Sequence, residues 1–249
     1  MRTKRQTSLM KPVIFSDFDG TITRVDVTDA ILEEFADPAW QDIEAEWVAG
    51  RIGSRECLRR QMALVRASAE ELVALIAAIP LDPYFARFHQ SIREAGVPFY
   101  VVSDGFDYVI RRVLRNCGVD GELLNGCHLF SSFLRVEGRN TVIDFPHWPL
   151  PCEHGCATCK PEVMQRMSGG HRPVIFIGDG LSDRFAVEQA EVVFARDKLL
   201  AYCRDHSVPC QPFSTFADIA QAIELLVDRG PEGERSGHGS RSGKAASRV

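Results

Sequence analysis

Short apolar runs that end at polar residues recur along the chain. They occupy residues 13–16, 97–102, 174–177 and 192–195. The runs are rich in β-branched and aromatic residues and lack polar alternation, which is typical of strands buried on both faces of a sheet. Helical periodicity lies between and beside them, at about 84–95, 107–117, 161–168 and 182–190. This alternation predicts an α/β fold with a doubly wound, mostly parallel sheet.

The stretch 25–83 interrupts that alternation. Its apolar residues follow helical spacing, with breaks at Pro38, Gly50 and Pro80, and no strand pattern is evident. We therefore predict a helical cap, inserted after the first strand and covering a site at the edge of the sheet.

A second insertion is predicted further along the chain. Two strand-like runs, at 127–133 and 141–145, flank a turn at 137–140, which indicates a β-hairpin. Beyond residue 230 the chain is rich in Gly, Ser and charge, and it offers little to bury. The predicted units are a core of 12–24 and 84–229, the cap 25–83, a hairpin and Cys-rich insert at 124–159 within the core, and a disordered tail at 230–249.

Composition and charge narrow the classes of function. The 249 residues are 45% hydrophobic and 25% charged, as in globular proteins. The net charge is −5, yet both ends are basic, so the body is more acidic than the total. An acidic body argues against nucleic-acid binding. We find no apolar run long enough for a membrane span and no secretory signal, and we expect a cytoplasmic protein. The oligomeric state is not indicated.

The first run is followed directly by Asp17 and Asp19, with Gly20 next. Two carboxylates on such a loop suit covalent catalysis, in which one attacks an electrophile and the other moves a proton. The same pattern is also typical of a turn with solvated acids.

A second acidic loop follows the run at 174–177. It contains Asp179 and Asp183, which would share one face if a helix began there. The carboxyl ends of parallel strands meet at one edge of a sheet, so these acids are expected to approach Asp17 and Asp19. Such a cluster repels itself without a cation, and Mg²⁺ is the cation that carboxylate oxygens suit. An acidic helix start is the alternative.

Two single residues complete the pattern. Ser103 follows the second apolar run, where its hydroxyl and its backbone amide could both donate hydrogen bonds to a phosphate oxygen. Lys160, before a helix that starts with Pro161, would neutralise phosphate charge. Taken singly, a serine after a strand, such as Ser103, is more often a helix cap. A lysine before a helix, such as Lys160, is usually a surface residue.

Together these motifs resemble the haloacid dehalogenase superfamily of phosphohydrolases, in order and in position at strand ends. The helical insert is similar to the class of that superfamily to which phosphoserine phosphatases belong. The resemblance implies an aspartyl-phosphate formed on Asp17, with Asp19 as general acid and then base. It implies phosphate binding by Ser103 and Lys160. It also implies Mg²⁺ held by the Asp17 side chain, the Asp19 carbonyl and Asp179, with Asp183 as a direct or supporting ligand.

Further segments, at 35–40, 98–103, 144–147, 156–161 and 194–197, resemble the phosphatases of bacterial methionine salvage. Those enzymes act on 2-hydroxy-3-keto-5-methylthiopentenyl-1-phosphate, which is the small phosphorylated metabolite that the resemblance implies. Phosphoserine phosphatases carry a Glu nine residues after the nucleophile, where this chain has Asp26. That difference weakens the phosphoserine alternative.

Two readings from other functional classes remain. Receiver-like signalling modules also place a phosphoacceptor Asp, other acids, a Ser or Thr and a Lys at strand ends, but they need no cap. An inactive relative that only binds phosphorylated ligands is the other alternative.

The eight cysteines include a cluster just before Lys160. Cys152, Cys156 and Cys159 would suit a structural Zn²⁺ ion, with Cys127 as the fourth ligand. Other possible ligands nearby in the sequence are His128, His147 and His154. The alternative is a reduced Cys-rich loop that binds no metal.

Overall fold

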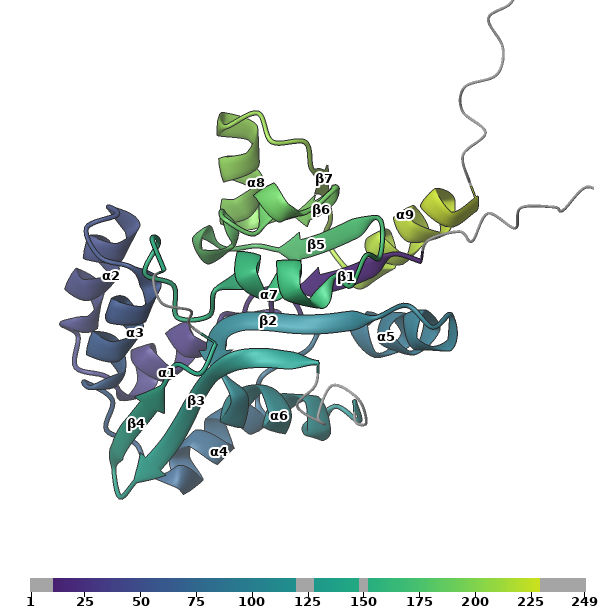
Figure 1. The fold of residues 1–249 in the computed structure, drawn as a ribbon. Coiled ribbons are helices and arrows are strands. Elements are labelled where there is room, and N and C mark those ends of the chain that lie inside the picture. The colour runs from purple at the N-terminus through teal and green to yellow at the C-terminus, as the bar shows by residue number, and fades with distance from the viewer. Residues whose placement is uncertain (1–10, 120–127, 148–151, 229–249) are drawn as a thin grey trace, which may run out of the picture.

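The computed structural model describes residues 11–119, 128–147 and 152–228, without the side chains of 225–228. The described strands form one sheet in the order β4-β3-β2-β1-β5-β6-β7 (Figure 1). Their bounds are Val13–Ser16 (β1), Phe99–Phe106 (β2), Leu129–Glu137 (β3), Asn140–Asp144 (β4), Val174–Gly178 (β5), Val192–Ala195 (β6) and Gln211–Pro212 (β7). All neighbouring pairs are parallel except β3 with β4.

Helices cover both faces of this sheet. Along β1, Ile14 packs into a cluster with residues of α5, α6 and α9, whereas Phe15 packs into a second cluster with residues of α7 and α8. Successive side chains of a strand point to opposite faces of the sheet, so each strand contributes side chains to both hydrophobic clusters. The prediction of a doubly wound, mostly parallel α/β sheet is confirmed. The helices of the core are α5 (Phe85–Glu94), α6 (Asp107–Asn116), α7 (Lys160–Met167), α8 (Asp197–Asp205) and α9 (Phe216–Asp228).

The stretch 25–83, called the insert below, is helical. Its helices are α1 (Val27–Phe35), α2 (Trp40–Val48), α3 (Ser54–Met62) and α4 (Ala69–Ala77). A capping box starts α4, in which Ser68 and Glu71 satisfy each other's backbone N–H groups. In Figure 1, α1, α2 and α3 lie beyond one end of the sheet, whereas α4 lies beside α6. The insert therefore contacts the core through α4, which packs against α6, and through α3, which packs against β4, whereas α1 and α2 lie beyond the strand ends.

Three local features differ from the sequence-based expectations. Strand β2 does not end before Ser103 but continues to Phe106 through a register shift. The hairpin expected around 137–140 is present, with Glu137 paired to Asn140 across the turn, but its first strand, β3, joins the main sheet beside β2 and so extends that sheet. The helix expected at 182–190 is replaced by two 3₁₀ turns, η2 (Leu181–Asp183) and η3 (Val187–Gln189).

Some expectations fall outside the described residues. These are the basic start, residues 120–127 including Cys127, residues 148–151, and the tail from 229. Within the described part, no helix has both the length and the apolar character that a membrane crossing requires.

Candidate active site

The end of β1 carries Asp17 into a tightly held loop. Its backbone N–H donates to the Ile177 carbonyl of β5 at 2.9 Å, which places the carboxylate between the two central strands. The side chain is buried, and its Oδ1 accepts the N–H of Phe18 at 2.7 Å. The loop turns at Gly20, where φ is +68° and an added Cβ would lie 2.3 Å from Oδ2 of Asp179. Only glycine fits this approach of the two acidic loops.

The end of β5 supplies the second acidic loop. Oδ1 of Asp179 accepts the hydroxyl of Thr21 at 2.5 Å, which ties this loop to the first one. Asp183 is fully buried in η2, and its Oδ2 accepts the N–H groups of Asp179 and Gly180 at 3.1 Å each. The Asp183 carboxylate thus folds back to satisfy the amides that precede it, in the capping-box arrangement that starts η2.

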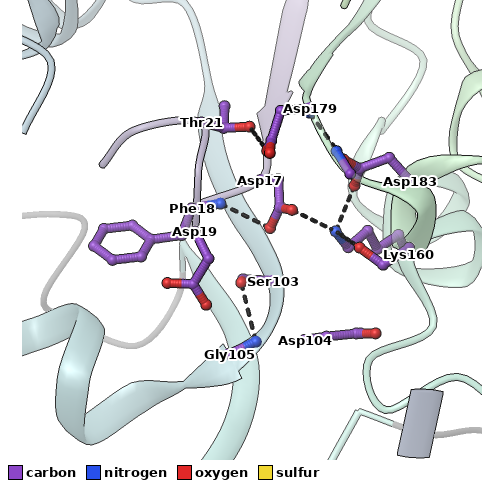
Figure 2. A network of polar contacts seen from close by, with 12 residues as sticks. Asp17, Phe18, Asp19, Thr21, Ser103, Asp104, Gly105, Lys160, Asp179 and Asp183 are labelled. Atoms are coloured by element: carbon purple, nitrogen blue, oxygen red, sulfur yellow. Dashed lines mark hydrogen bonds and ion pairs between the residues drawn. The ribbon is translucent and has the colours of Figure 1, made fainter. Parts of the chain in front are cut away.

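Lys160 joins the two acidic loops. It is the first residue of α7 and is 2% exposed, so it is a core residue and not a surface one. Its Nζ lies 3.0 Å from Oδ2 of Asp17 and 2.5 Å from Oδ1 of Asp183 (Figure 2). Burial by itself would lower the pKa of Lys160, but the two carboxylates outweigh it and raise the pKa above its usual value. The ammonium group therefore stays charged between two acids.

Ser103 and Asp19 lie on another side of Asp17. The Ser103 hydroxyl is buried and accepts the N–H of Gly105 at 3.1 Å. A Cβ on Gly105 would lie 2.3 Å from Oδ2 of Asp19 and 3.2 Å from Oγ of Ser103, so the glycine leaves room for both side chains. Figure 2 shows the Asp19 carboxylate pointing away from Asp179. Its Oδ1 is buried and has no hydrogen-bond partner, so it is free to act on a bound molecule.

Burial first, and the charges of neighbouring carboxylates second, raise the pKa values of three of these acids. Burial together with the charges of Asp17 and Asp183 raises the pKa of Asp179 to about 8. Burial also raises the pKa of Asp183 to about 7, against the opposing effect of Lys160. The pKa of Asp19 lies well above its usual value, because of burial first and then the charges of Asp26 and Asp17. Negative charge in this site exceeds what Lys160 neutralises.

Three of these carboxylates are arranged to hold a cation. One oxygen each from Asp17, Asp179 and Asp183 lies within 4.8 Å of the other two. Oxygen donors of this kind suit Mg²⁺, and a divalent ion would relieve the repulsion that raises the pKa values. The side chain of Asp19 is not in this group, in keeping with the expectation that Asp19 contributes its backbone carbonyl.

Two residues near the site were not predicted from the sequence. Asp104 is a half-buried residue whose carboxylate accepts the N–H of Thr158 at 2.9 Å, and its charge helps to raise the pKa of Lys160. Arg196 donates from Nη2 to carbonyls of the first acidic loop, including that of Thr21 at 3.2 Å. Asp104 directly follows Ser103 in the chain, and Arg196 lies in the segment 194–197 that resembles the methionine-salvage phosphatases, but neither was expected in the site.

A cavity of about 560 Å³ opens over these side chains. Its floor includes Asp17, Asp19 and Ser103 of the core, and its other wall comes from the insert. The wall residues of α2 and α3 are Glu44, Trp47, Ser54, Cys57, Leu58 and Gln61. The cavity is therefore large enough for a small metabolite, with charged groups at one end and a mixed apolar and polar wall at the other.

Comparison with known proteins identifies the family. The family profile described as haloacid dehalogenase-like hydrolase matches residues 14–188. The chain belongs to this family. It is 32% identical over 217 residues to the 2-hydroxy-3-keto-5-methylthiopentenyl-1-phosphate phosphatase of Geobacillus kaustophilus, covering 86% of this chain and 96% of that one. The enzyme of the same name from Geobacillus thermodenitrificans is 31% identical over 222 residues, with coverages of 86% and 96%.

Solved structures support the same fold. A substrate-bound phosphoserine phosphatase complex superposes with a TM-score of 0.66 at 19% identity, covering 86% of this chain and 98% of that one. The predicted superfamily and the predicted enzyme class, a phosphatase, are confirmed. None of these descriptions mentions zinc, so the comparisons do not support the expected zinc ion.

Proposed function

We propose that this hydrolase is a Mg²⁺-dependent phosphomonoesterase that works through an aspartyl-phosphate on Asp17. The observation that carries the proposal is the buried group in which Lys160 lies 3.0 Å from Asp17, beside the carboxylate cluster. Asp17, Asp179 and Asp183 would hold the Mg²⁺ ion, which when bound neutralises charge on phosphate and carboxylate oxygens. We also propose that the chain is divided as expected from the sequence, with residues 12–24 and 84–229 as the core and residues 25–83 as the cap.

The reaction then has two halves. A carboxylate oxygen of Asp17 forms a bond to phosphorus as the bond from phosphorus to the ester oxygen breaks, and Asp19 gives its proton to the leaving alkoxide. In the second half a water molecule attacks the same phosphorus, Asp19 takes the proton back, and the bond to Asp17 breaks to release phosphate. The raised pKa of Asp19 favours the protonated form that the first half needs.

Lys160 and Ser103 would hold the transferring group. The Lys160 ammonium faces Asp17 from one side and the Ser103 hydroxyl lies in the same pocket floor. Phosphoryl transfer depends mainly on positioning and on stabilising charge on the phosphoryl oxygens. Because Lys160 is charged and is held in place by buried carboxylates, its ammonium group is already oriented to stabilise charge on the phosphoryl oxygens.

The first test is phosphate release from an aryl phosphate with and without Mg²⁺. We expect turnover with Mg²⁺ and loss of turnover after chelation, restored by adding the ion back. A receiver-like module would accept phosphate once without multiple turnovers, and a binding-only relative would release none. Either result would contradict the proposal.

Asp19→Asn tests the general acid. We expect a rate loss of roughly 10²–10⁴-fold for an ester with a poor leaving group, because the alkoxide departs unprotonated. For a dinitrophenyl ester, whose leaving group needs no proton, the loss in the first half should be much smaller. Pre-steady-state release of the phenol separates the two halves. Equal losses across the leaving-group series would contradict this role for Asp19.

For the substrate we propose 2-hydroxy-3-keto-5-methylthiopentenyl-1-phosphate, on which the named relatives act. The wall of Trp47, Cys57 and Leu58 offers an apolar surface for a methylthio group, and Gln61 offers an amide for hydroxyl or keto oxygens. Asp26 is exposed at the edge of the cavity and is one carbon shorter than the Glu that phosphoserine phosphatases carry at this place, and its Oδ1 already accepts the N–H of Asp29 at 2.9 Å. This favours the uncharged tail over phosphoserine.

A panel of phosphorylated metabolites tests that choice. We expect kcat/KM for the methylthio substrate to exceed that for phosphoserine by about 10²-fold or more, and Leu58→Asn to reduce the ratio mainly through KM. Equal or higher kcat/KM for phosphoserine would favour the alternative, a phosphoserine phosphatase-like enzyme.

A further inference from the structure

A group of three cysteines lies outside the carboxylate site. The Sγ atoms of Cys152, Cys156 and Cys159 all lie within 4.8 Å of one another. Cys156 and Cys159 are buried and Cys152 is half-buried, and all three are free thiols. Zn–S bonds of about 2.3 Å at tetrahedral angles separate sulfur atoms by about 3.8 Å. The three sulfurs are thus close to the spacing that one zinc ion requires.

The backbone of this loop turns around the first sulfur. Burial by itself would raise the pKa of Cys152, but neighbouring backbone N–H groups, that of Cys156 first, outweigh it and lower the pKa. Gly155 has a φ of +63°, and its own N–H donates to the Cys152 carbonyl at 3.4 Å, which closes the turn. N–H groups that point at a sulfur stabilise a thiolate, which is the form that binds metal. The ring of His154 stacks on Phe185 at 3.7 Å between centroids and is not a member of the group.

The other two sulfurs are placed where a thiolate needs a cation. The pKa of Cys156 is raised by burial, then by the charge of Asp104 and by its cysteine neighbours. The pKa of Cys159 is raised by burial and by Cys152, although the N–H of Glu162 acts against this. Both residues are therefore neutral thiols in the metal-free loop. A divalent ion that prefers sulfur displaces their protons on binding, and its charge then offsets the repulsion among the three thiolates.

We propose that Cys152, Cys156 and Cys159 bind one zinc ion, at a site separate from the Mg²⁺ site and not used in the chemistry. The three sulfurs supply three of the four positions of a tetrahedral zinc ion, and the fourth is open to a ligand outside this group. The carboxylates of the active site are hard oxygen donors, so the two sites select different metals.

The contacts of the cysteine loop show what the ion would stabilise. The Gly155 carbonyl accepts the N–H of Arg55 at 3.1 Å, and the Ala157 N–H donates to Oγ of Ser54 at 3.0 Å, both at the start of α3. Lys160 follows Cys159 directly and begins α7. Zinc at this loop therefore fixes the contact between the insert and the core and the position of Lys160.

Metal analysis of the full chain, purified without chelators or metal-affinity resin, tests the proposal. We expect about one zinc per chain in the wild type and less than about one tenth of that in Cys152→Ser after dialysis. Cys152 is half-buried, so this substitution disturbs the core least. Cys117→Ser, at an exposed cysteine outside the group, and Asp179→Asn, in the carboxylate cluster, should both retain the wild-type zinc content.

A second measurement uses only wild-type protein, so it does not depend on the folding of a variant. Wild-type protein loaded with Co²⁺ should show the intense near-ultraviolet absorption of thiolate-to-cobalt charge transfer, and zinc should slow the reaction of the thiols with an alkylating reagent. The proposal is overturned if wild-type protein holds no zinc and shows no such absorption. It is equally overturned if mass spectrometry finds a disulfide within the group, or if zinc is lost in Asp179→Asn but kept in Cys152→Ser.

Discussion

Asp17→Asn is expected to lower phosphate release by roughly 10⁴-fold or more, because an amide is neither anionic nor nucleophilic enough to take the phosphoryl group. The fold should persist, since an Asn Oδ1 can still accept the N–H of Phe18 and the backbone bond to Ile177 is untouched. Lys160 keeps Asp183 as its partner. Steady-state phosphate release and circular dichroism measure the two expectations.

A covalent label separates chemistry from binding in this variant. Wild-type enzyme quenched in acid after mixing with a radiolabelled substrate should carry labelled phosphate that hydroxylamine removes, and Asp17→Asn should carry none. Asp205→Asn makes the same chemical change at an exposed position in the last turn of α8 and should behave as wild type. Near-normal turnover or normal labelling in Asp17→Asn would rule out Asp17 as the nucleophile.

Lys160→Met is expected to reduce both stability and turnover. The lysine is 2% exposed and paired with Asp17 and Asp183, so its removal leaves two buried carboxylates without a counter-charge. Breaking a buried ion pair from one side costs about 3–5 kcal/mol. Loss of one group that stabilises transition-state charge costs about 10²–10³-fold in kcat. Met has a similar length and fills the space, so a cavity adds little to the loss.

Urea denaturation without Mg²⁺ and steady-state kinetics with it measure these effects. The control is Lys11→Met, at an exposed lysine whose Nζ donates to the Ala95 carbonyl at 3.0 Å, and we expect it to change stability by less than about 1 kcal/mol. If Lys160→Met matches Lys11→Met in both measurements, Lys160 contributes neither to the stability of the site nor to catalysis.

Much of the fold could be predicted because strand and helix periodicities are local. The run at 13–16 coincides with β1, and the helix expected at 84–95 appears as α5. The division of the helix expected at 182–190 into the 3₁₀ turns η2 and η3 was not predicted. The Asp183 carboxylate accepts the amides of Asp179 and Gly180 in a capping box, and because the same motif also starts α-helices, the local sequence does not distinguish the two outcomes.

The predicted site residues Asp17, Asp19, Ser103, Lys160, Asp179 and Asp183 all contribute side chains to one region of the structure. The rule that strand ends meet at one edge of a parallel sheet was enough to expect this. The rule does not say which neighbouring side chains also enter the site, such as Asp104, which directly follows Ser103 in β2 and accepts the N–H of the distant Thr158. Cys127, the fourth expected zinc ligand, lies outside the described residues.

The sequence by itself determined the mostly parallel character of the sheet, the two acidic loops and the family. Each of these can be recognised from short motifs whose residues are neighbours along the chain. Only the tertiary structure decided that Lys160 is buried between Asp17 and Asp183, and that the cysteine loop bonds to the start of α3. Those contacts join segments more than 20 residues apart in the chain. Their energies depend on desolvation and on distance, which exist only once the chain has packed.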